Sequence, residues 1–462
     1  MKNLKRLVSL LLCVCMLLGM TALAEEAVPA EETTAAPVEL AADTLLVTVN
    51  GEQLTWADVE PIYTSLSSQY ASYYDFSTAE VVDFFRAAAL ESAIVEALLL
   101  QKSVEFGLSE LTEEEKASLE ALALSDWESG IQSYLEYMYP EGTEEELAAA
   151  REEAIAYYNE NGYSPESLKL RYERYTVMEK VQNLLLQDVT VTDEEVEALY
   201  QSLVENDKAL YENDIAAYVD YNNQVDMMAY YAMMYGSVSE MDYAWYRPAG
   251  FRAVKHILLP VDETLMATYT DLQARYDEQQ SDAAAAEEAA EEAAEPAEPV
   301  TPEMINEAKA AVLASLADKI DEINQKIAEG VDFDELIATY GVDADGNPSD
   351  PGMANEPTKT TGYEVSAASS NYVPEFVEAS MSIAEVGGVS APYLSDYGIH
   401  IVKYIADIPA GPIEMTDAQR EAKRASLLST KQNEQYTAAV ESWINESVIE
   451  YTGVFADVNS LQ

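Results

Sequence analysis

The chain has 462 residues, of which 85 are acidic and 25 basic, and its formal net charge at pH 7 is −60. Such a charge excludes nucleic acid and anionic lipid as natural partners, because phosphate binding needs clustered Lys and Arg side chains that displace counterions. The hydrophobic content of 48% is ample for packed cores, and the length predicts two or three domains.

Residues 1–24 predict a secretory signal peptide. Three basic residues precede an apolar run over 7–23, and Ala22-Leu23-Ala24 supplies the small residues after which signal peptidase cleaves. A retained membrane anchor is the alternative, since the run approaches the roughly 20 residues that span a bilayer. Both cysteines, Cys13 and Cys15, lie in this run, so the mature chain has no disulfide and no sulfur ligand for a metal.

Residues 25–42 are rich in Ala, Pro, Glu and Thr and predict a disordered leader. A strand over Leu45–Val49 follows. Asn50-Gly51 favours a tight type I′ hairpin into a second strand at Gln53-Leu54. Thr55 and Asp58 have the spacing of a helix N-cap and its partner, so a helix should start there.

The next part of the chain, up to residue 246, predicts a helical domain. Apolar periodicity and capping signals place helices as follows: Ala79–Phe106, Glu144–Asn161, Pro165–Leu186 and Asp193–Val204. This block has no candidate catalytic triad and no phosphate-binding loop, which favours a packing and holding role.

Residues 211–246 contain eight tyrosines and five methionines. Met and Tyr side chains recur on promiscuous peptide-binding surfaces. They are equally typical of a helical core, and the sequence leaves both interpretations open.

Residues 281–300 form a low-complexity run of Ala and Glu, which predicts a solvated insert with no folded element. One helix should then run from Pro302 to Gly330, with a shorter helix around Phe333. The loop 343–348 follows, where Asp343, Asp345 and Asn347 alternate as calcium ligands do. Position twelve counted from Asp343 is Ala354, however, which argues against an EF-hand.

The chain has two histidines, and both lie in short apolar frames: Lys255-His256-Ile257-Leu258 and Gly398-Ile399-His400-Ile401-Val402. Imidazole is the side chain whose unperturbed pKa lies nearest to neutrality. Each histidine could be an ordinary core residue of a strand. Two of them in matching frames favour a paired site.

These frames belong to a series of motifs that resembles the parvulin family of peptidyl-prolyl isomerases. The series continues with Glu329–Leu336, which matches the family's Gly-x-Asp-Phe-x-x-Leu junction, with Tyr372–Ala379 and with Ser395–Val402. The resemblance covers residues 247–408, with the insert 281–300 inside them. It implies a small antiparallel sheet flanked by helices, with no cofactor and no metal.

The resemblance also implies the site residues. A hydrogen-bond network of His256, Asp343, His400 and Ser395 should surround the carbonyl group that rotates. An apolar pocket for the proline ring should be formed by Tyr372, Phe376 and Met381.

Two departures from the family pattern affect this site. The family's Gly-Asp-Leu-Gly turn is replaced by Gly362-Tyr363-Glu364-Val365, which alters one wall of the proline pocket and puts activity in doubt. Asp262-Glu263 stands where phosphate-specific relatives carry basic residues, which argues against phosphoserine recognition.

The layout as a whole resembles secreted foldases of the SurA and PrsA type. This likeness implies an α+β protein in which a helical chaperone domain, 43–246, is completed by 413–462. The C-terminal helix should be capped by Thr416 and Gln419, and residues 448–451 should pair with the first strand.

The function that follows from the resemblance is isomerisation and chaperoning of unfolded, proline-containing polypeptides outside the cytoplasm, with cell-envelope association and a homodimer left open. No nucleic acid and no stable membrane insertion after signal cleavage are expected. The alternative function is a binding-only chaperone or scaffold with a degenerate parvulin domain.

Overall fold

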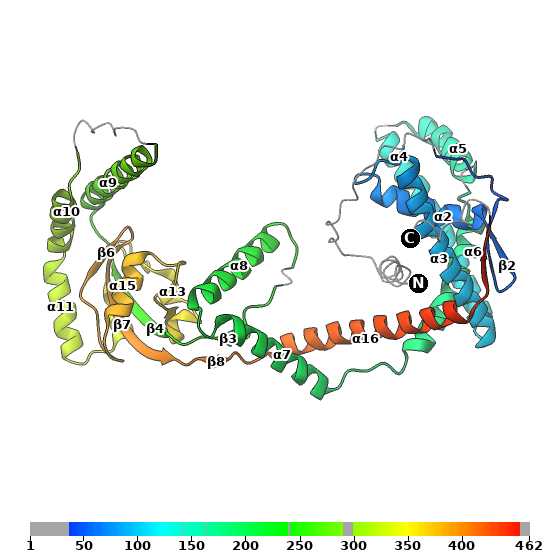
Figure 1. Ribbon diagram of the computed structural model, residues 1–462. Helices are drawn as coiled ribbons and strands as arrows, with labels where there is room; N and C mark the ends of the chain where they lie inside the picture. The colour runs from blue at the N-terminus through cyan, green and yellow to red at the C-terminus, as the bar shows by residue number, and fades with distance from the viewer. Residues whose placement is uncertain (1–36, 141, 161, 239–240, 290–298, 453–462) are drawn as a thin grey trace. The chain divides into compact units, whose positions relative to one another are not determined.

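A computed structural model describes residues 37–140, 142–160, 162–238, 241–289 and 299–452, with the side chains of 144 and 282–289 left aside. The signal segment 1–24 and the leader up to residue 36 lie outside these ranges. Contacts divide the chain into two units, residues 1–192 with 421–462 and residues 193–420. Both are drawn in Figure 1, and each is described by itself.

The first unit contains a small antiparallel sheet that joins the two ends of the described chain. Its strands are β1 (Leu45–Val49), β2 (Glu52–Thr55) and β9 (Ile449–Tyr451), in the order β2-β1-β9. Asn50 and Gly51 have φ angles of 53° and 89°, the left-handed pair that a type I′ turn needs. The predicted hairpin and the predicted pairing of the C-terminal strand with β1 are both present.

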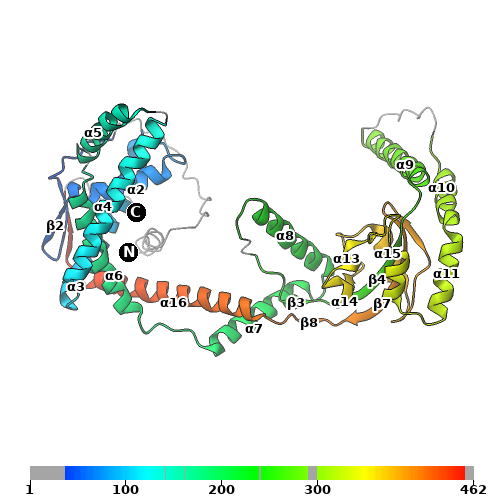
Figure 2. The same cartoon turned by 180° about the vertical axis from the view of Figure 1, so that it is seen from behind.

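Helices make up the rest of the first unit, and Figure 2 shows them from behind. Their bounds are α2 (Trp56–Tyr70), α3 (Ala79–Glu105), α4 (Glu113–Met138), α5 (Glu144–Glu160), α6 (Pro165–Leu186) and α16 (Asp417–Glu446), the last beginning in the second unit. Two predicted caps are confirmed. The Asp58 carboxylate accepts from the Thr55 N–H at 2.7 Å, and the Gln419 side chain accepts from the Thr416 N–H at 3.0 Å. In the part of the chain that the structure describes, no helix has the length and apolar character that crossing a membrane requires.

The second unit begins earlier than the sequence predicts, at Asp193 instead of 247. Two helices of the predicted chaperone domain, α7 (Asp193–Tyr211) and α8 (Ile215–Met234), pack on it. The Tyr200 hydroxyl donates to the Ile413 carbonyl at 3.0 Å, and the Tyr218 ring meets the Phe251 ring edge-on at 5.3 Å. Burial of these aromatic rings attaches α7 and α8 to the unit that follows them in sequence.

The remaining elements of the second unit surround a four-stranded antiparallel sheet of order β5-β4-β7-β6. Its strands are β4 (Phe251–Leu259), β5 (Tyr363–Val365), β6 (Tyr393–Ser395) and β7 (Gly398–Ile408). A separate two-stranded sheet pairs β3 (Tyr246–Arg247) with β8 (Gly411–Pro412). The helices are α9 (Glu263–Ala289), α10 (Pro302–Ser315), α11 (Ala317–Ala328), α12 (Phe333–Tyr340), α13 (Pro351–Ala354), α14 (Thr358–Thr361) and α15 (Pro374–Ser382). The predicted α+β class is confirmed.

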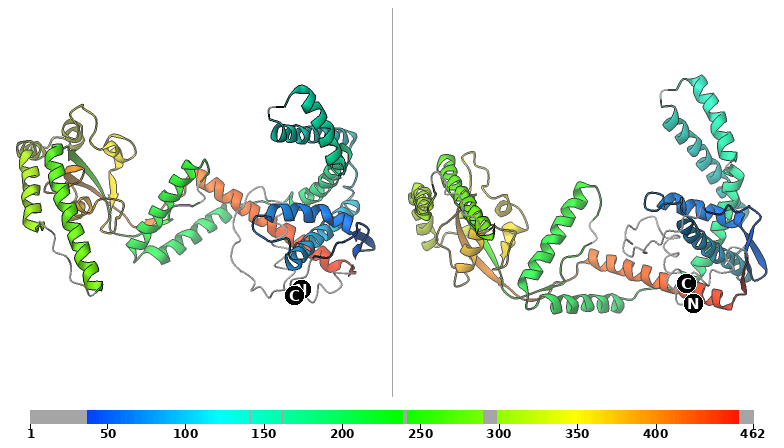
Figure 3. Two further views of the ribbon diagram at one scale, coloured as in Figure 1. Left: turned by 90° about the horizontal axis from the view of Figure 1, so that it is seen from above. Right: turned by 45° about the horizontal axis from the view of Figure 1, so that its top comes forward.

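The two faces of this sheet are covered differently. Ile257 and Ile401 point to one face, where they form a buried core with side chains of α9 to α12. Val254 and Val402 point to the other face and pack against α15. Residues of a strand alternate between faces, so His256 and His400 lie on the α15 side. Figure 3 gives two further views of this arrangement.

Two sequence predictions about the insert region are wrong. Residues 281–289 continue α9 as helix, which suits their alanine-rich composition; 290–298 lie outside the described residues. The single helix predicted from Pro302 is two helices, α10 and α11, separated at Leu316. Leu316 packs against the core of the α9 to α12 face, so a buried contact overrides the local helical preference.

The end of the insert is anchored through Gln279. Its side-chain oxygen accepts from the Val300 N–H at 2.7 Å and its amide donates to the Val300 carbonyl at 3.2 Å. Val300 is 3% exposed, so these backbone groups have little access to water. The Gln279 side chain therefore fixes where α10 begins.

We predict that Gln279→Ala destabilises the protein by about 1–3 kcal/mol, because it leaves two buried backbone groups of Val300 unpaired. The exposed neighbour Gln280 offers the matched control, and Gln280→Ala should change stability by less than about 0.5 kcal/mol. Thermal melting followed by circular dichroism measures both. Equal melting temperatures for the two variants would contradict the anchoring role.

Candidate functional site

The register of β4 and β7 brings the two imidazoles together. His256 lies opposite Val402, and His400 lies opposite Leu258, so the two histidines are diagonal neighbours on one face of the sheet. Their Nδ1 atoms are 2.9 Å apart, and their ring planes are within 9° of parallel. The two matching frames therefore bring the histidines into direct contact, as the sequence predicts.

An aspartate completes the chain on the His256 side. His256 Nε2 lies 2.5 Å from Asp350 Oδ2. The same carboxylate accepts from the Tyr363 hydroxyl at 3.0 Å and from the Gly352 N–H at 2.8 Å. The last of these contacts makes Asp350 the N-cap of α13, so one side chain both starts a helix and orients an imidazole.

Asp343, the acidic residue that the sequence predicts for the hydrogen-bond network, is bonded within its own loop instead. Its carboxylate accepts from the N–H groups of Asp345 and Asn347 at 2.9 and 2.8 Å, and these bonds close the turn 343–347. The acidic partner of His256 is therefore Asp350 in place of Asp343.

A serine completes the chain on the His400 side. Ser395 Oγ lies 2.7 Å from His400 Nε2 and accepts from the Tyr397 N–H at 3.2 Å. The exposed fractions of His256, His400 and Ser395 are 4%, 4% and 2%. All three polar side chains are buried, and all three have partners.

The directions of the hydrogen bonds follow from the Asp350 carboxylate, which accepts only. A neutral His256 must donate from Nε2 to Asp350, so its Nδ1 accepts from the Nδ1–H of His400. His400 Nε2 then accepts from the Ser395 hydroxyl. This gives one consistent set of tautomers along Ser395, His400, His256 and Asp350, with the negative charge at the Asp350 end.

The electrostatics agree with that assignment. Burial lowers the pKa of His400 to about 3, so His400 is neutral at pH 7. Burial alone would raise the pKa of Asp350. The hydrogen bond from His256, with the Gly352 and Tyr363 bonds, outweighs burial and lowers the Asp350 pKa. Asp350 is therefore ionised at neutral pH.

Aromatic side chains border the histidine pair. Phe376 of α15 lies edge-on to His256, with the ring centroids 5.0 Å apart, and Tyr372 lies 5.5 Å from Phe376. Tyr363 contacts both Tyr372 and His256. The structure thus places Phe376 beside the imidazoles and Tyr372 next to Phe376. Met381 is half-buried near the C-terminus of α15 and is absent from this cluster of described side chains.

An arginine side chain and a glycine hold these aromatic residues in position. Arg252 of β4 donates to the carbonyls of Ser380 and Ile383 at 2.9 and 3.0 Å, which fixes the C-terminal end of α15. Gly362 has a φ of 78°, and a Cβ there would lie 2.6 Å from the Val254 carbonyl oxygen. The altered turn therefore needs glycine at this position for Tyr363 to enter β5 beside β4.

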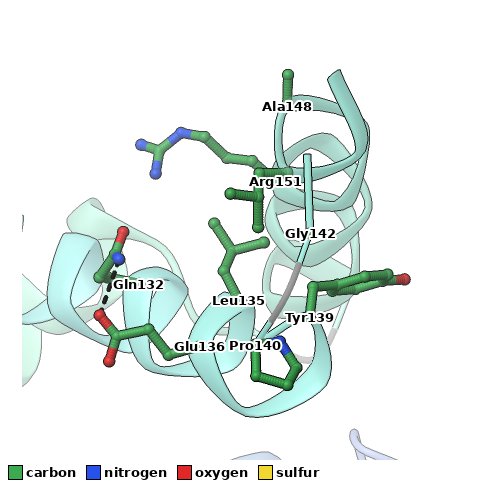
Figure 4. Close-up of a pocket in the computed structure, with 9 residues that line it drawn as sticks. Gln132, Leu135, Glu136, Tyr139, Pro140, Gly142, Ala148 and Arg151 are labelled. Atoms are coloured by element: carbon green, nitrogen blue, oxygen red, sulfur yellow. Dashed lines mark hydrogen bonds between the residues drawn. The ribbon is translucent and has the colours of Figure 1, made fainter. Parts of the chain in front are cut away.

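The first unit has a separate hollow between α4 and α5, of about 490 Å³. Figure 4 shows Leu135 and Tyr139 on one side of it and Arg151 on the other. The Arg151 guanidinium is paired with Glu128 at 2.5 Å. The residues that line this hollow include no histidine, so the histidine pair is the better candidate for a catalytic site.

The sequence comparisons give partial matches. No protein-family model matches the chain. It is 30% identical over 131 residues to the foldase protein PrsA of Oceanobacillus iheyensis, which is 28% of this chain and 40% of the relative. It is 29% identical over 133 residues to the PrsA foldase of Clostridium botulinum strain Loch Maree, 28% of this chain and 37% of the relative. The chain thus spans less than half the length of these relatives. The resemblance to PrsA-type foldases is confirmed over the matched part.

Matches to solved structures cover more of the chain, but their sequence identities and TM-scores are low. A SurA-like chaperone of Campylobacter jejuni is 11% identical, covering 88% of this chain and 99% of its own, with a TM-score of 0.27. PrsA of Bacillus subtilis is 13% identical, covering 90% and 98%, with a TM-score of 0.18. Neither likeness is close enough to superpose this chain on the relative.

The low pKa of His400 predicts a specific loss of stability in acid. Because its pKa falls from 6.5 to about 3 on folding, the unfolded chain binds the proton first, and stability falls as the pH drops below 6.5. Between pH 7 and 4.5 the protein should lose about 1–3 kcal/mol more than the His400→Gln variant. Denaturant unfolding at both pH values measures this difference.

Asp350 does not confound this test, because its pKa is lowered from the ordinary value of 3.8. Its contribution to stability is present above 3.8 and is lost only at lower pH. The same loss of stability in both proteins would mean that His400 is not buried in the neutral form.

Proposed function

We propose that the chain is a peptidyl-prolyl cis/trans isomerase that also holds unfolded exported polypeptides. The observation that supports this best is the chain of hydrogen bonds from Ser395 through both histidines to an ionised Asp350, beside the aromatic rings of Tyr372 and Phe376. Such a site has an anion and an apolar wall. The Ser395 hydroxyl is bonded to an imidazole but is 2% exposed, so it is too buried to attack a substrate as the nucleophile of covalent catalysis would.

The reaction makes and breaks no covalent bond. Rotation about an X–Pro bond has a barrier of roughly 20 kcal/mol, because the planar amide is stabilised by resonance. Resonance gives the carbonyl oxygen partial negative charge, and twisting the bond removes that charge. An enzyme accelerates the rotation by interacting better with the twisted amide than with the planar one.

An ionised Asp350 beside the carbonyl oxygen would act in this way. Its negative charge repels the oxygen more strongly in the planar amide than in the twisted one, so the barrier falls. The Tyr363 hydroxyl already donates to Asp350, so this donor is not available to stabilise the planar amide. The Asp350 side chain is 18% exposed, which leaves it accessible to a peptide.

The remaining residues take supporting roles. His256, His400 and Ser395 are too buried to touch a peptide, and they would position and ionise Asp350. Phe376 and Tyr372 would hold the proline ring and exclude water. Met381, at the end of α15, is outside the aromatic cluster among the described side chains, and we propose no role for it in holding the proline ring.

The substrates we propose are unfolded, proline-containing polypeptides outside the cytoplasm. Two observations support this: the signal-like segment 1–24 and the relatives named foldase. The acidic surface favours soluble protein clients over nucleic acid or anionic lipid. The site chemistry requires no metal and no cofactor.

A binding-only chaperone is the alternative proposal. It is supported by the 4% exposure of both imidazoles and by the replacement of the usual turn with Gly362-Tyr363-Glu364-Val365. The hollow between α4 and α5 would then accept apolar side chains of a client.

Replacing the carboxylate tests the isomerase proposal most directly. Asp350→Asn keeps the size of the side chain but removes its charge, so kcat/KM for a proline tetrapeptide should fall about tenfold or more. Asp343→Asn is the matched control, and it should retain most of the activity because Asp343 contacts its own turn. Exchange spectroscopy by NMR measures both rates. Loss of activity in Asp343→Asn alone would restore the acidic role to Asp343.

Removing one imidazole tests the positioning role. His256→Ala should lower the tetrapeptide rate about tenfold and leave the circular dichroism spectrum unchanged, because the strands keep their apolar frames. A protein that folds normally and isomerises at the wild-type rate without His256 would favour the binding-only alternative.

A further inference from the structure

The C-terminal half of α8 exposes an unusual amount of apolar surface. Tyr218, Val219 and Val225 anchor the first half of the helix in the second unit. Beyond them the exposed side chains form what we call the α8 surface: Met227 (47%), Met228 (45%), Tyr230 (55%), Tyr231 (47%), Met233 (70%) and Met234 (62%). In Figures 1 and 2 this half of α8 projects away from the sheet of its unit. Each interpretation of the Tyr- and Met-rich stretch holds for one part of it: Tyr211, Tyr218 and Tyr246 are core residues, whereas the side chains after Val225 are exposed.

The α8 surface adjoins the candidate pocket. The Asn223 amide donates to the Ser370 hydroxyl at 3.0 Å, which ties α8 to the loop that leads into α15. Tyr372 is two residues after Ser370, and its ring centroid lies 5.5 Å from that of Phe376. A peptide leaving the pocket past Tyr372 would therefore pass close to α8.

The side chains of α8 determine which kind of partner would bind to the α8 surface. Met and Tyr side chains adapt to many apolar partners, because Met is flexible and Tyr keeps a polar end. The helix carries Asp220 and Asp226 and has no Lys or Arg. An apolar segment with positive charges complements it. A second copy of this chain, with a net charge of −60, would be repelled.

We propose that the α8 surface binds the part of an unfolded polypeptide that flanks the proline in the pocket, with a preference for segments that combine apolar and basic residues. The proposal rests on the isomerase function proposed above, because it places the flank relative to a proline bound at Tyr372 and Phe376. It adds a specificity that the pocket alone does not have.

The test compares two double variants of the whole protein. Tyr230→Gln with Met233→Gln removes one tyrosine and one methionine of the α8 surface. Tyr137→Gln with Met138→Gln, at the end of α4, is the matched control, with exposed fractions of 84% and 50%. The probe is a labelled synthetic peptide of about 20 residues, roughly 65 Å when extended, with Leu and Lys around one central proline. Fluorescence anisotropy measures its Kd.

The α8 variant should bind this peptide about tenfold more weakly than the wild type, and the control variant should bind it normally. A peptide with Glu in place of Lys should bind the wild type about tenfold more weakly. The rate on a tetrapeptide, too short to reach α8, should be the same in all three proteins. Circular dichroism checks that each variant is folded.

Equal affinity of the α8 variant and the wild type for the long peptide would overturn the proposal, as would an equal loss in the control variant. Association of the wild-type protein with itself that disappears in the α8 variant would also overturn it, since the occupant would then be a second copy. Failure of the isomerase function is seen separately, as a wild-type protein that binds the long peptide through α8 and does not turn over the tetrapeptide.

Discussion

The antiparallel register between β4 and β7 is the constraint on which the second unit depends. It sets His256 opposite Val402 and His400 opposite Leu258, and it thereby decides which residues face the core and which face α15. Because side chains alternate along a strand, a shift of one residue would move an imidazole into the apolar core and expose isoleucines on the site face. The core of the α9 to α12 face, with Ile257 and Ile401 fully buried, makes such a shift costly. The same residues that stabilise the unit therefore position its site.

Burying two imidazoles side by side imposes a second constraint. Each nitrogen needs a partner, because an unpaired polar group in the interior costs about 1–3 kcal/mol. Four nitrogens are satisfied by one shared Nδ1–Nδ1 bond, one serine and one carboxylate. The carboxylate fixes the tautomers of the whole row, and the row in turn keeps the carboxylate ionised. The negative charge of the site is thus a product of the fold as much as of Asp350 itself.

Much of the fold could be predicted from the sequence, because its signals are local. The turn at Asn50-Gly51, the caps at Thr55 and Thr416 and the frames around both histidines each depend on neighbouring residues. The role of Asp350 as the partner of His256 could not be predicted in the same way. Standing before Pro351, it looks like an ordinary helix cap, and its contact with His256 arises only when residues 94 positions apart meet. Asp343 is the acidic residue that the family resemblance implies, but its carboxylate accepts hydrogen bonds within its own turn. The break at Leu316 and the attachment of α7 and α8 to the second unit likewise depend on tertiary burial.

The candidate site and the proposed α8 surface, both in the second unit, would serve different parts of the reaction. Contacts between α8 and the flanks of a client would be the same for the cis, the twisted and the trans amide, so they strengthen binding without lowering the barrier. Their effect is to keep prolines near Asp350 at a high effective concentration. A high effective concentration helps only if each contact with α8 is weak enough for the client to be released after its X–Pro bond has rotated. Flexible methionine side chains on an exposed helix end meet this requirement better than a deep pocket would, because they bind many sequences and order little of the client. The buried, rigid histidine row would act on the amide through Asp350, and the exposed, adaptable α8 surface would accept the many flanking segments that combine apolar and basic residues.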